Sequence, residues 1–227
     1  MTLREYVDKW RACEGCGLAT VRNTVVVFSP WKVDPQEGDP LILIVGEAPG
    51  KQEDQTGDAF VGESGQILRR DILVPAGLRL GVITNTVACW PGKGNPDPTA
   101  DQIQACAPRL DELVEAVQPA GLLTVGRIST RVRSYPWRQH FDGRPTASIT
   151  HPAALLRKGH PNAATAKTLR AQVAKVKNLL KKLGVAPKDE TATAACDHDW
   201  VEAGQWLFED GGRKPFNACT KCGLLEG

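Results

Sequence analysis

Short apolar runs alternate with segments of helical periodicity along the chain, and this pattern predicts an α/β protein. The apolar runs predict buried strands at 25–28, 41–45, 80–84, 121–126 and 146–150. The periodic or helix-compatible segments predict helices at 1–12, 64–76, 99–117, 128–134 and 162–183. Because strands alternate with helices, we expect a mostly parallel sheet that is covered on both faces.

One glycine-rich stretch, Gly46–Gly65 (GEAPGKQEDQTGDAFVGESG), follows the apolar run at 41–45 directly. Glycines let backbone N–H groups approach a ligand closely. In open α/β sheets, a loop at the carboxyl end of a parallel strand is the usual place for a ligand. The alternative is an acidic surface loop whose isolated aromatic residue, Phe60, is tucked into the core.

Composition favours one globular domain with an appendage, since the chain has 227 residues of which 41% are hydrophobic. The net charge of +2 is small, but nine Lys or Arg residues and a single acid, Asp142, lie between Arg127 and Arg170. Such a surface suits nucleic acid, although a solvated basic face is the alternative.

We find neither a run of 18 apolar residues nor a secretory leader, so we expect a cytoplasmic protein with no membrane span and no oligomeric partner.

The cysteines predict metal binding, because they are seven in number and include close pairs, which argues against a disulfide framework. Residues 184–195 have no periodicity and predict a linker. Beyond it lies a Cys₃His set in which three thiols and one imidazole suit zinc: Cys196, His198, Cys219 and Cys222. We therefore expect a small zinc-bound element over 196–227, which binds DNA, docks a protein partner or caps the chain.

Four features in a fixed order carry a resemblance to a known family. They are GEAPG…ED…G…FVG at 46–62, TN at 84–85, HPAALLR at 151–157, and the cysteines at 13, 16, 89 and 106. Together they resemble the family 4 uracil-DNA glycosylases, the iron–sulfur branch of the uracil-DNA glycosylase superfamily. The resemblance covers residues 10–183 and defines a glycosylase-like domain over 1–183. It implies a three-layer α/β/α fold with a four-stranded parallel sheet, and release of uracil from DNA.

The residues agree with that chemistry, which needs donors aimed at the negative charge that develops on the departing base. By resemblance, Asn85 reads the base edge, His151 donates to the charged carbonyl oxygen, and Phe60 stacks on the extruded base. Glu47 orients or deprotonates the attacking water or stabilises the cationic sugar, while backbone groups of Gly46 and Ala48 complete the pocket. Taken singly, each of these residues also has a purely structural interpretation.

The segment after the histidine suggests contacts with DNA. Arg157, Lys158 and His160 can hold phosphates, and Leu155 and Leu156 can wedge into the stack that the flipped base leaves. The alternative is that the leucines begin the core-facing side of the next helix.

The first four cysteines match the ligand layout of the family, so the resemblance implies that Cys13, Cys16, Cys89 and Cys106 hold a structural [4Fe–4S] cluster. Four thiolates suit zinc as well.

Three rival functions remain: excision of another modified pyrimidine, uracil-DNA binding without turnover or with covalent trapping through a histidine such as His140, and a metal-stabilised adaptor with a vestigial pocket.

Overall fold

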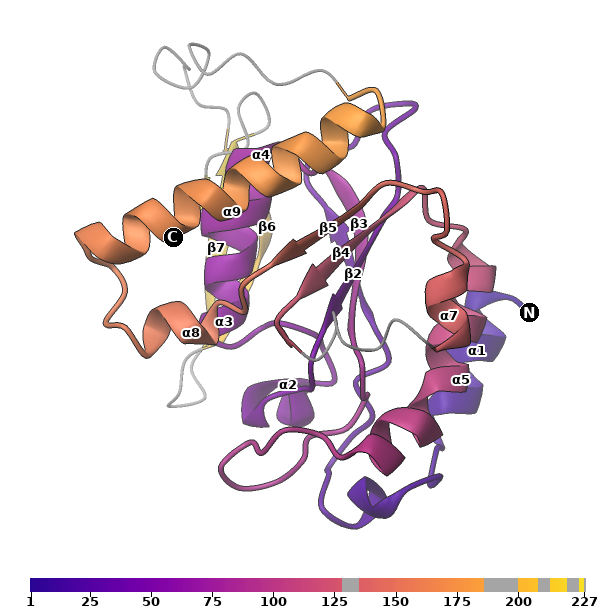
Figure 1. The fold of residues 1–227 in the computed structure, drawn as a ribbon. Coiled ribbons are helices and arrows are strands. Elements are labelled where there is room, and N and C mark those ends of the chain that lie inside the picture. Colours follow the sequence, from indigo (N-terminus) through magenta and orange to yellow (C-terminus); the bar gives the residue numbers. More distant parts are fainter. Residues whose placement is uncertain (128–134, 186–199, 208–212, 220–224, 227) are drawn as a thin grey trace.

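A computed structural model describes residues 1–127, 135–185, 200–207, 213–219 and 225–226 of the chain (Figure 1). The predicted helix at 128–134 lies outside this part of the chain. None of the described helices is both long and apolar enough to cross a membrane.

The sheet at the centre of the domain has five strands in the order β1-β3-β2-β4-β5. They are β1 (Ser29–Lys32), β2 (Ile42–Gly46), β3 (Leu80–Asn85), β4 (Gly121–Val125) and β5 (Thr146–Ile149). The last four pair in parallel, as predicted, and β1 joins the edge antiparallel to β3. The fifth strand adds to the four-stranded parallel sheet that the resemblance implies.

The predicted strand at 25–28 is displaced, because pairing with β3 begins only at Ser29. Val25, Val26 and Val27 are buried in the core without forming a strand of the sheet. Their apolar character therefore reflects burial, while Trp31 anchors the true edge strand through a bond of 2.8 Å from its indole N–H to the Leu78 carbonyl.

Helices cover both faces of the sheet and give the predicted three layers (Figure 1). On one face lie α1 (Leu3–Arg11), α5 (Ala100–Val117) and α7 (Pro136–Gln139). On the other lie α9 (Ala163–Lys182) and a composite helix made of α3 (Glu63–Gln66), η2 (Ile67–Leu73) and α4 (Val74–Ala76). Strand β2 feeds both cores, since Leu43 and Val45 face the first layer and Ile42 and Ile44 the second.

Helix boundaries follow local signals in the sequence. Thr99 caps α5 and forms a capping box with Gln102, which confirms the predicted start of this helix. Asn162 caps α9 in the same way. The composite helix is α-helical at its ends, but η2 is π-helical. Pro75 lies two residues after η2, and its missing N–H removes one α-helical bond.

Short elements complete the described domain: η1 (Gly17–Thr20), α2 (Lys51–Thr56) and α8 (Ala153–Leu156). A second, antiparallel sheet contains β6 (Trp200–Leu207), β7 (Arg213–Cys219) and β8 (Leu225–Glu226). Of the four predicted zinc ligands, Cys219 ends β7, while positions 196, 198 and 222 lie outside the described residues. The greater part of the predicted linker lies outside them as well.

Candidate active site

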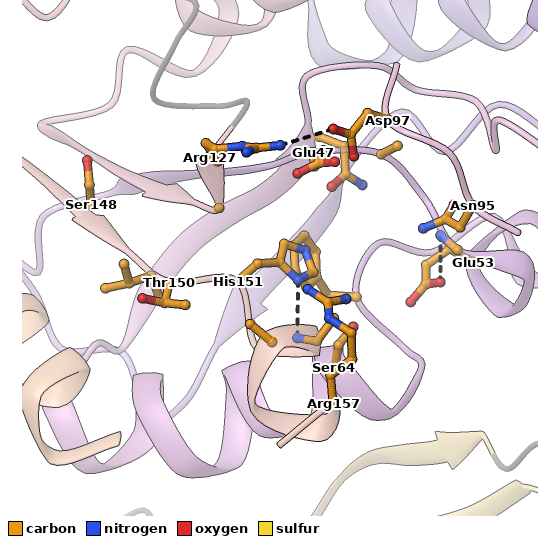
Figure 2. Close-up of a pocket in the computed structure, with 18 of the residues that line it drawn as sticks. Glu47, Glu53, Ser64, Asn95, Asp97, Arg127, Ser148, Thr150, His151 and Arg157 are labelled. Carbon is orange, nitrogen blue, oxygen red and sulfur yellow. Dashed lines mark hydrogen bonds and ion pairs between the residues drawn. The ribbon is translucent and has the colours of Figure 1, made fainter. Parts of the chain in front are cut away.

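The carboxyl ends of the four parallel strands meet at one edge of the sheet. Gly46 at the end of β2 is in register with Asn85 at the end of β3. The Gly126 N–H, just past β4, donates to Ile149 at the end of β5 over 3.0 Å. This convergence surrounds a cavity of about 690 Å³ whose walls include Glu47, Ala48, Phe60, Asn85, Arg157 and His151 (Figure 2).

The position of the Phe60 ring in the cavity wall requires a glycine at position 46. A Cβ on Gly46 would overlap both the Phe60 ring and Asn85 Oδ1, so no larger residue fits there. The Phe60 ring stacks against the His151 imidazole, with the centroids 5.9 Å apart and the planes tilted by 30°. Phe60 and His151, which are distant in sequence, thus form one side of the cavity.

The backbone of Phe60 is held in a conformation that few side-chain-bearing residues adopt, with φ of +57°. Arg69, on the π-helical segment, donates to the Phe60 carbonyl over 3.0 Å and to the Ala59 carbonyl over 2.8 Å. Gly65 lies so close to the Phe60 carbonyl that any Cβ there would overlap it. These contacts fix the loop and therefore the direction of the ring.

Two acids of the glycine-rich loop brace its backbone. The buried Glu53 carboxylate accepts from the N–H groups of Gly50, Val61 and Gly62 over 2.9–3.0 Å. The fully buried Asp54 accepts from the backbone of Asn23 and Thr24 and so ties the loop to the segment before β1. Their main task is to hold the loop.

Asn85 presents an unused acceptor to the cavity. Its side chain is 1% exposed, and Oδ1 has no hydrogen-bond partner among the described residues. A buried polar atom without a partner costs free energy, so this oxygen is suited to a ligand that brings an N–H donor.

His151 is a neutral donor at the same cavity. The Ala153 N–H donates to its Nδ1 over 3.3 Å, which leaves the proton of the neutral ring on Nε2. Burial, together with the nearby Arg157 guanidinium, lowers the pKa of His151 to about 4. The imidazole is therefore uncharged near neutral pH and carries an N–H.

Glu47 has a pKa raised to about 7, first by burial and then by a hydrogen bond to and repulsion from Asp97. Arg127 lies 3.3 Å from the Asp97 carboxylate, and Figure 2 shows this pair beside Glu47. Near neutral pH the Glu47 carboxyl is thus poised to take up or release a proton.

The cavity accordingly combines an amide acceptor, a neutral imidazole donor, an aromatic face and a carboxyl of near-neutral pKa. Such a set can hold a planar heterocycle by stacking and by its polar edge, and can stabilise negative charge that develops on it.

A family model described as "Uracil DNA glycosylase superfamily" matches residues 35–190. The chain belongs to this superfamily. It is 34% identical over 176 residues to the type-4 uracil-DNA glycosylase of Sulfurisphaera tokodaii, an alignment that spans 68% of this chain and 76% of the relative. A second type-4 uracil-DNA glycosylase, from Thermotoga maritima, is 30% identical over 195 residues, or 78% of this chain and 94% of the relative. The relative from Saccharolobus solfataricus is 41% identical over a shorter stretch, 54% of this chain and 55% of its own.

Superfamily membership accounts for the fold, and the structure revises one predicted DNA contact. Leu155 is 2% exposed, because it lies on the inner side of the short helix α8. This burial favours the core-facing interpretation of Leu155 over a wedge in DNA. The adjacent Leu156 is half-buried, Arg157 lines the cavity, and Lys158 is exposed beside it.

Several residues at the cavity carry little signal in the sequence pattern. Asp97 and Asn95 lie in a segment that is rich in Pro and Gly, where no periodicity marks a direction. Lys175 reaches the cavity from α9, whose lysines as a group predicted only a polar face. Arg127 could have been singled out, because it lies two residues after the end of β4.

The four cysteines of the predicted cluster line a second cavity on the α5 side of the sheet, together with Arg109. In the described arrangement, no three of these thiols lie as close together as the ligands of one zinc ion do. Across the described residues, Asp111, Glu115 and His140 form the only such trio whose ligand atoms all lie within 4.8 Å, so no three of these thiols do. Thiolates that share one zinc, with bonds of about 2.3 Å, lie closer than this.

Arg109 also fits an anionic group in that cavity. It is fully buried, its Nε has no hydrogen-bond partner among the described residues, and it forms no ion pair with a described carboxylate. A buried cation needs a compensating charge, and a metal centre with four thiolates supplies one.

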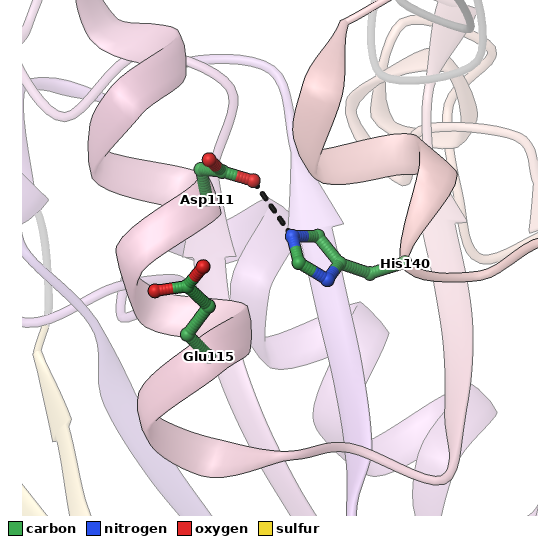
Figure 3. Close-up of side chains that lie close together, drawn as sticks. All are labelled: Asp111, Glu115 and His140. Carbon is green, nitrogen blue, oxygen red and sulfur yellow. Dashed lines mark hydrogen bonds and ion pairs between the residues drawn. The ribbon is translucent and has the colours of Figure 1, made fainter.

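His140 lies away from the cavity. Its Nε2 is 2.7 Å from Asp111 on α5, and Glu115 is one helical turn further on, as Figure 3 shows. This contact joins α7 to α5 and gives His140 a structural role on the described surface. It does not favour His140 as a residue that attacks DNA.

Proposed function

We propose that this protein hydrolyses the N-glycosidic bond of deoxyuridine in DNA, releasing uracil and leaving an abasic site. The observation that carries the proposal is the pairing, in one cavity, of the unpartnered Asn85 Oδ1 with the neutral His151. Uracil offers an N–H beside a carbonyl oxygen, which is the complement of these two groups. The type-4 names of the relatives support the same substrate.

In this proposal the deoxyuridine leaves the duplex and its base stacks on Phe60. Asn85 Oδ1 accepts the base N3–H, and His151 Nε2–H donates to the O2 carbonyl oxygen. As the bond from C1′ to N1 breaks, its electron pair goes to the uracil, and the His151 donor stabilises the charge on O2.

Glu47 completes the reaction on the sugar side. Its carboxylate orients a water molecule whose oxygen bonds to C1′, and it takes the proton that the water loses. A carboxylate also stabilises the positive charge that develops on the sugar. The pKa of about 7 leaves a large ionised fraction at neutral pH.

DNA phosphates bind around the mouth of the cavity. Arg157 lines the cavity and Lys158 is exposed next to it, which suits both to hold the phosphates that flank the extruded nucleotide. Leu156, rather than Leu155, is the residue of this segment that we assign to the gap that the extruded base leaves in the base stack of the duplex.

We further propose that Cys13, Cys16, Cys89 and Cys106 hold a [4Fe–4S] cluster, and that the Cys₃His set of the tail holds zinc. The wide thiol spacing and the unpartnered Arg109 Nε support the first assignment. When bound, the cluster supplies a crosslink between distant segments of the chain and takes no part in the hydrolysis.

An oligonucleotide with a single uracil tests the proposed reaction. A strand that breaks after alkali, with free uracil released, is the expected result. A covalent protein–DNA band would indicate trapping instead, a mobility shift without either would indicate binding only, and excision confined to another modified pyrimidine would change the substrate.

A further inference from the structure

Arg109 lies between the active-site cavity and the four-cysteine cavity. From the core-facing side of α5 it lines the four-cysteine cavity, and it is fully buried. Cys106 lies one helical turn before it on α5, at a spacing that places both residues on the same face. The other end of the side chain reaches the carboxyl end of β3.

The guanidinium makes a dense set of bonds at that end. Its Nη2 donates to the Asn85 carbonyl oxygen over 2.5 Å. Its Nη1 donates to Thr84 Oγ1 and to the Val27 carbonyl, each over 2.9 Å. The planar guanidinium, with its fork of N–H donors, thus fixes the backbone of Asn85, whose side chain lines the active-site cavity.

The guanidinium also lies close to the Cys106 thiol, which acts on it electrostatically. Nε is buried without a partner among the described residues, in a residue that lines the cysteine cavity. A guanidinium keeps its proton and its charge in proteins. The side chain therefore stays charged, and an anionic group among the cysteines is the natural partner for Nε.

We propose that Arg109 is a positioning residue that couples the four-cysteine centre to the base-reading end of β3. The proposal rests on the proposed function, because it gives Asn85 the task of reading uracil. The anionic centre holds the Arg109 cation in place, and the cation holds the Asn85 backbone. Loss or distortion of the centre then loosens the uracil site, beyond any effect on global stability.

Two lysine variants separate this coupling from a general effect near the cysteines. Arg109→Lys keeps the charge but loses the fork, so it disturbs both the centre and Asn85. Arg22→Lys is the matched control, since Arg22 donates to the Cys13 carbonyl over 2.5 Å and has a buried Nε without a partner, but makes no recorded bond to β3. The readouts are the visible absorption of the centre and the NMR signal of the Asn85 side-chain amide, followed while free uracil is added.

For Arg109→Lys we expect a changed absorption, a shifted Asn85 amide signal and about a 10- to 100-fold loss of uracil affinity, the scale of a small misplacement of a binding group. For Arg22→Lys we expect a changed absorption alone. A folded Arg109→Lys protein that keeps its centre, with the Asn85 signal and the uracil affinity of the wild type, overturns the proposal.

If Arg109→Lys fails to fold, Thr84→Val carries the test, because it removes one anchor of the guanidinium with little change in shape. We then expect both the Asn85 amide signal and the visible absorption of the centre to shift. If neither of them changes, the coupling is overturned. Wild-type protein that releases no uracil from the single-uracil oligonucleotide refutes the proposed function instead, while the Asn85 signal and the absorption still report on Arg109.

Discussion

At the scale of single residues, the environment of each polar group decides its role at the cavity. His151 is kept neutral by burial and by Arg157, with a pKa of about 4, whereas burial and Asp97 raise the pKa of Glu47 to about 7. The two groups can therefore act as a neutral donor and an ionisable carboxyl at the same pH. This separation supports the assignment of the donor role to His151 and of the water-orienting role to Glu47.

The pH dependence of excision tests the role of Asp97. If the Glu47 carboxylate is the active form, single-turnover rates fall as the pH drops through about 7, where Glu47 takes up a proton. Asp97→Asn removes a neighbouring negative charge, which lowers the pKa of Glu47 and moves this limb of the profile to lower pH.

Asp101→Asn is the control, because Asp101 is exposed in the first turn of α5 and does not line the cavity. Its profile should match that of the wild type. An acid limb that stays in place in Asp97→Asn would refute the coupling between the two carboxyl groups.

At the scale of elements, the apolar runs predicted the parallel strands correctly. A strand that is buried on both faces consists almost entirely of apolar residues, so it stands out in the sequence. The same logic placed Glu47, Asn85 and His151 at strand ends, and the family motif added Phe60. The sequence pattern did not predict where a side chain points when that direction depends on packing. Leu155 turned out to face the core, and Asp97 lies in a segment whose path depends on tertiary contacts.

The π-helical segment gives a test of how an element positions the stacking ring. Arg69→Met removes the two bonds to the Ala59 and Phe60 carbonyls, so the strained loop relaxes and Phe60 loses its direction. We expect a KM for uracil-containing DNA that is raised about tenfold with a smaller change in kcat, since stacking acts on the bound base.

Arg70→Met is the matched control on the same helix, because the described bonds of Arg70 go to the neighbouring Asp71 alone and its side chain is 49% exposed. It should keep the KM of the wild type. Equal effects in the two variants would show that the composite helix, rather than the Phe60 carbonyl contact, is responsible.

At the scale of the whole molecule, the four cysteines come from separate parts of the domain. Cys13 and Cys16 lie between α1 and η1, Cys89 follows β3, and Cys106 lies on α5. A metal centre held by all four thiols would therefore crosslink the N-terminal segment to the layer that supports Asn85. The family resemblance implied this set of cysteines, but the link through Arg109 depends on the folded arrangement.

Protein purified without oxygen should be brown and absorb near about 400 nm, as iron–sulfur proteins do. Cys106→Ala should lose this band and melt about 5 °C or more below the wild type, because it opens the crosslink. Cys219→Ala, in the tail, should keep the band. A colourless wild-type sample that contains zinc alone would contradict the cluster assignment.

The central claim is that Asn85 and His151 act together on one extruded uracil, and single-turnover release of labelled uracil from a duplex measures this most directly. We predict that Asn85→Ala and His151→Ala each lower the rate by about 100-fold or more, while both proteins keep the melting behaviour and the visible spectrum of the wild type. Release at close to the wild-type rate by both folded variants would contradict the account.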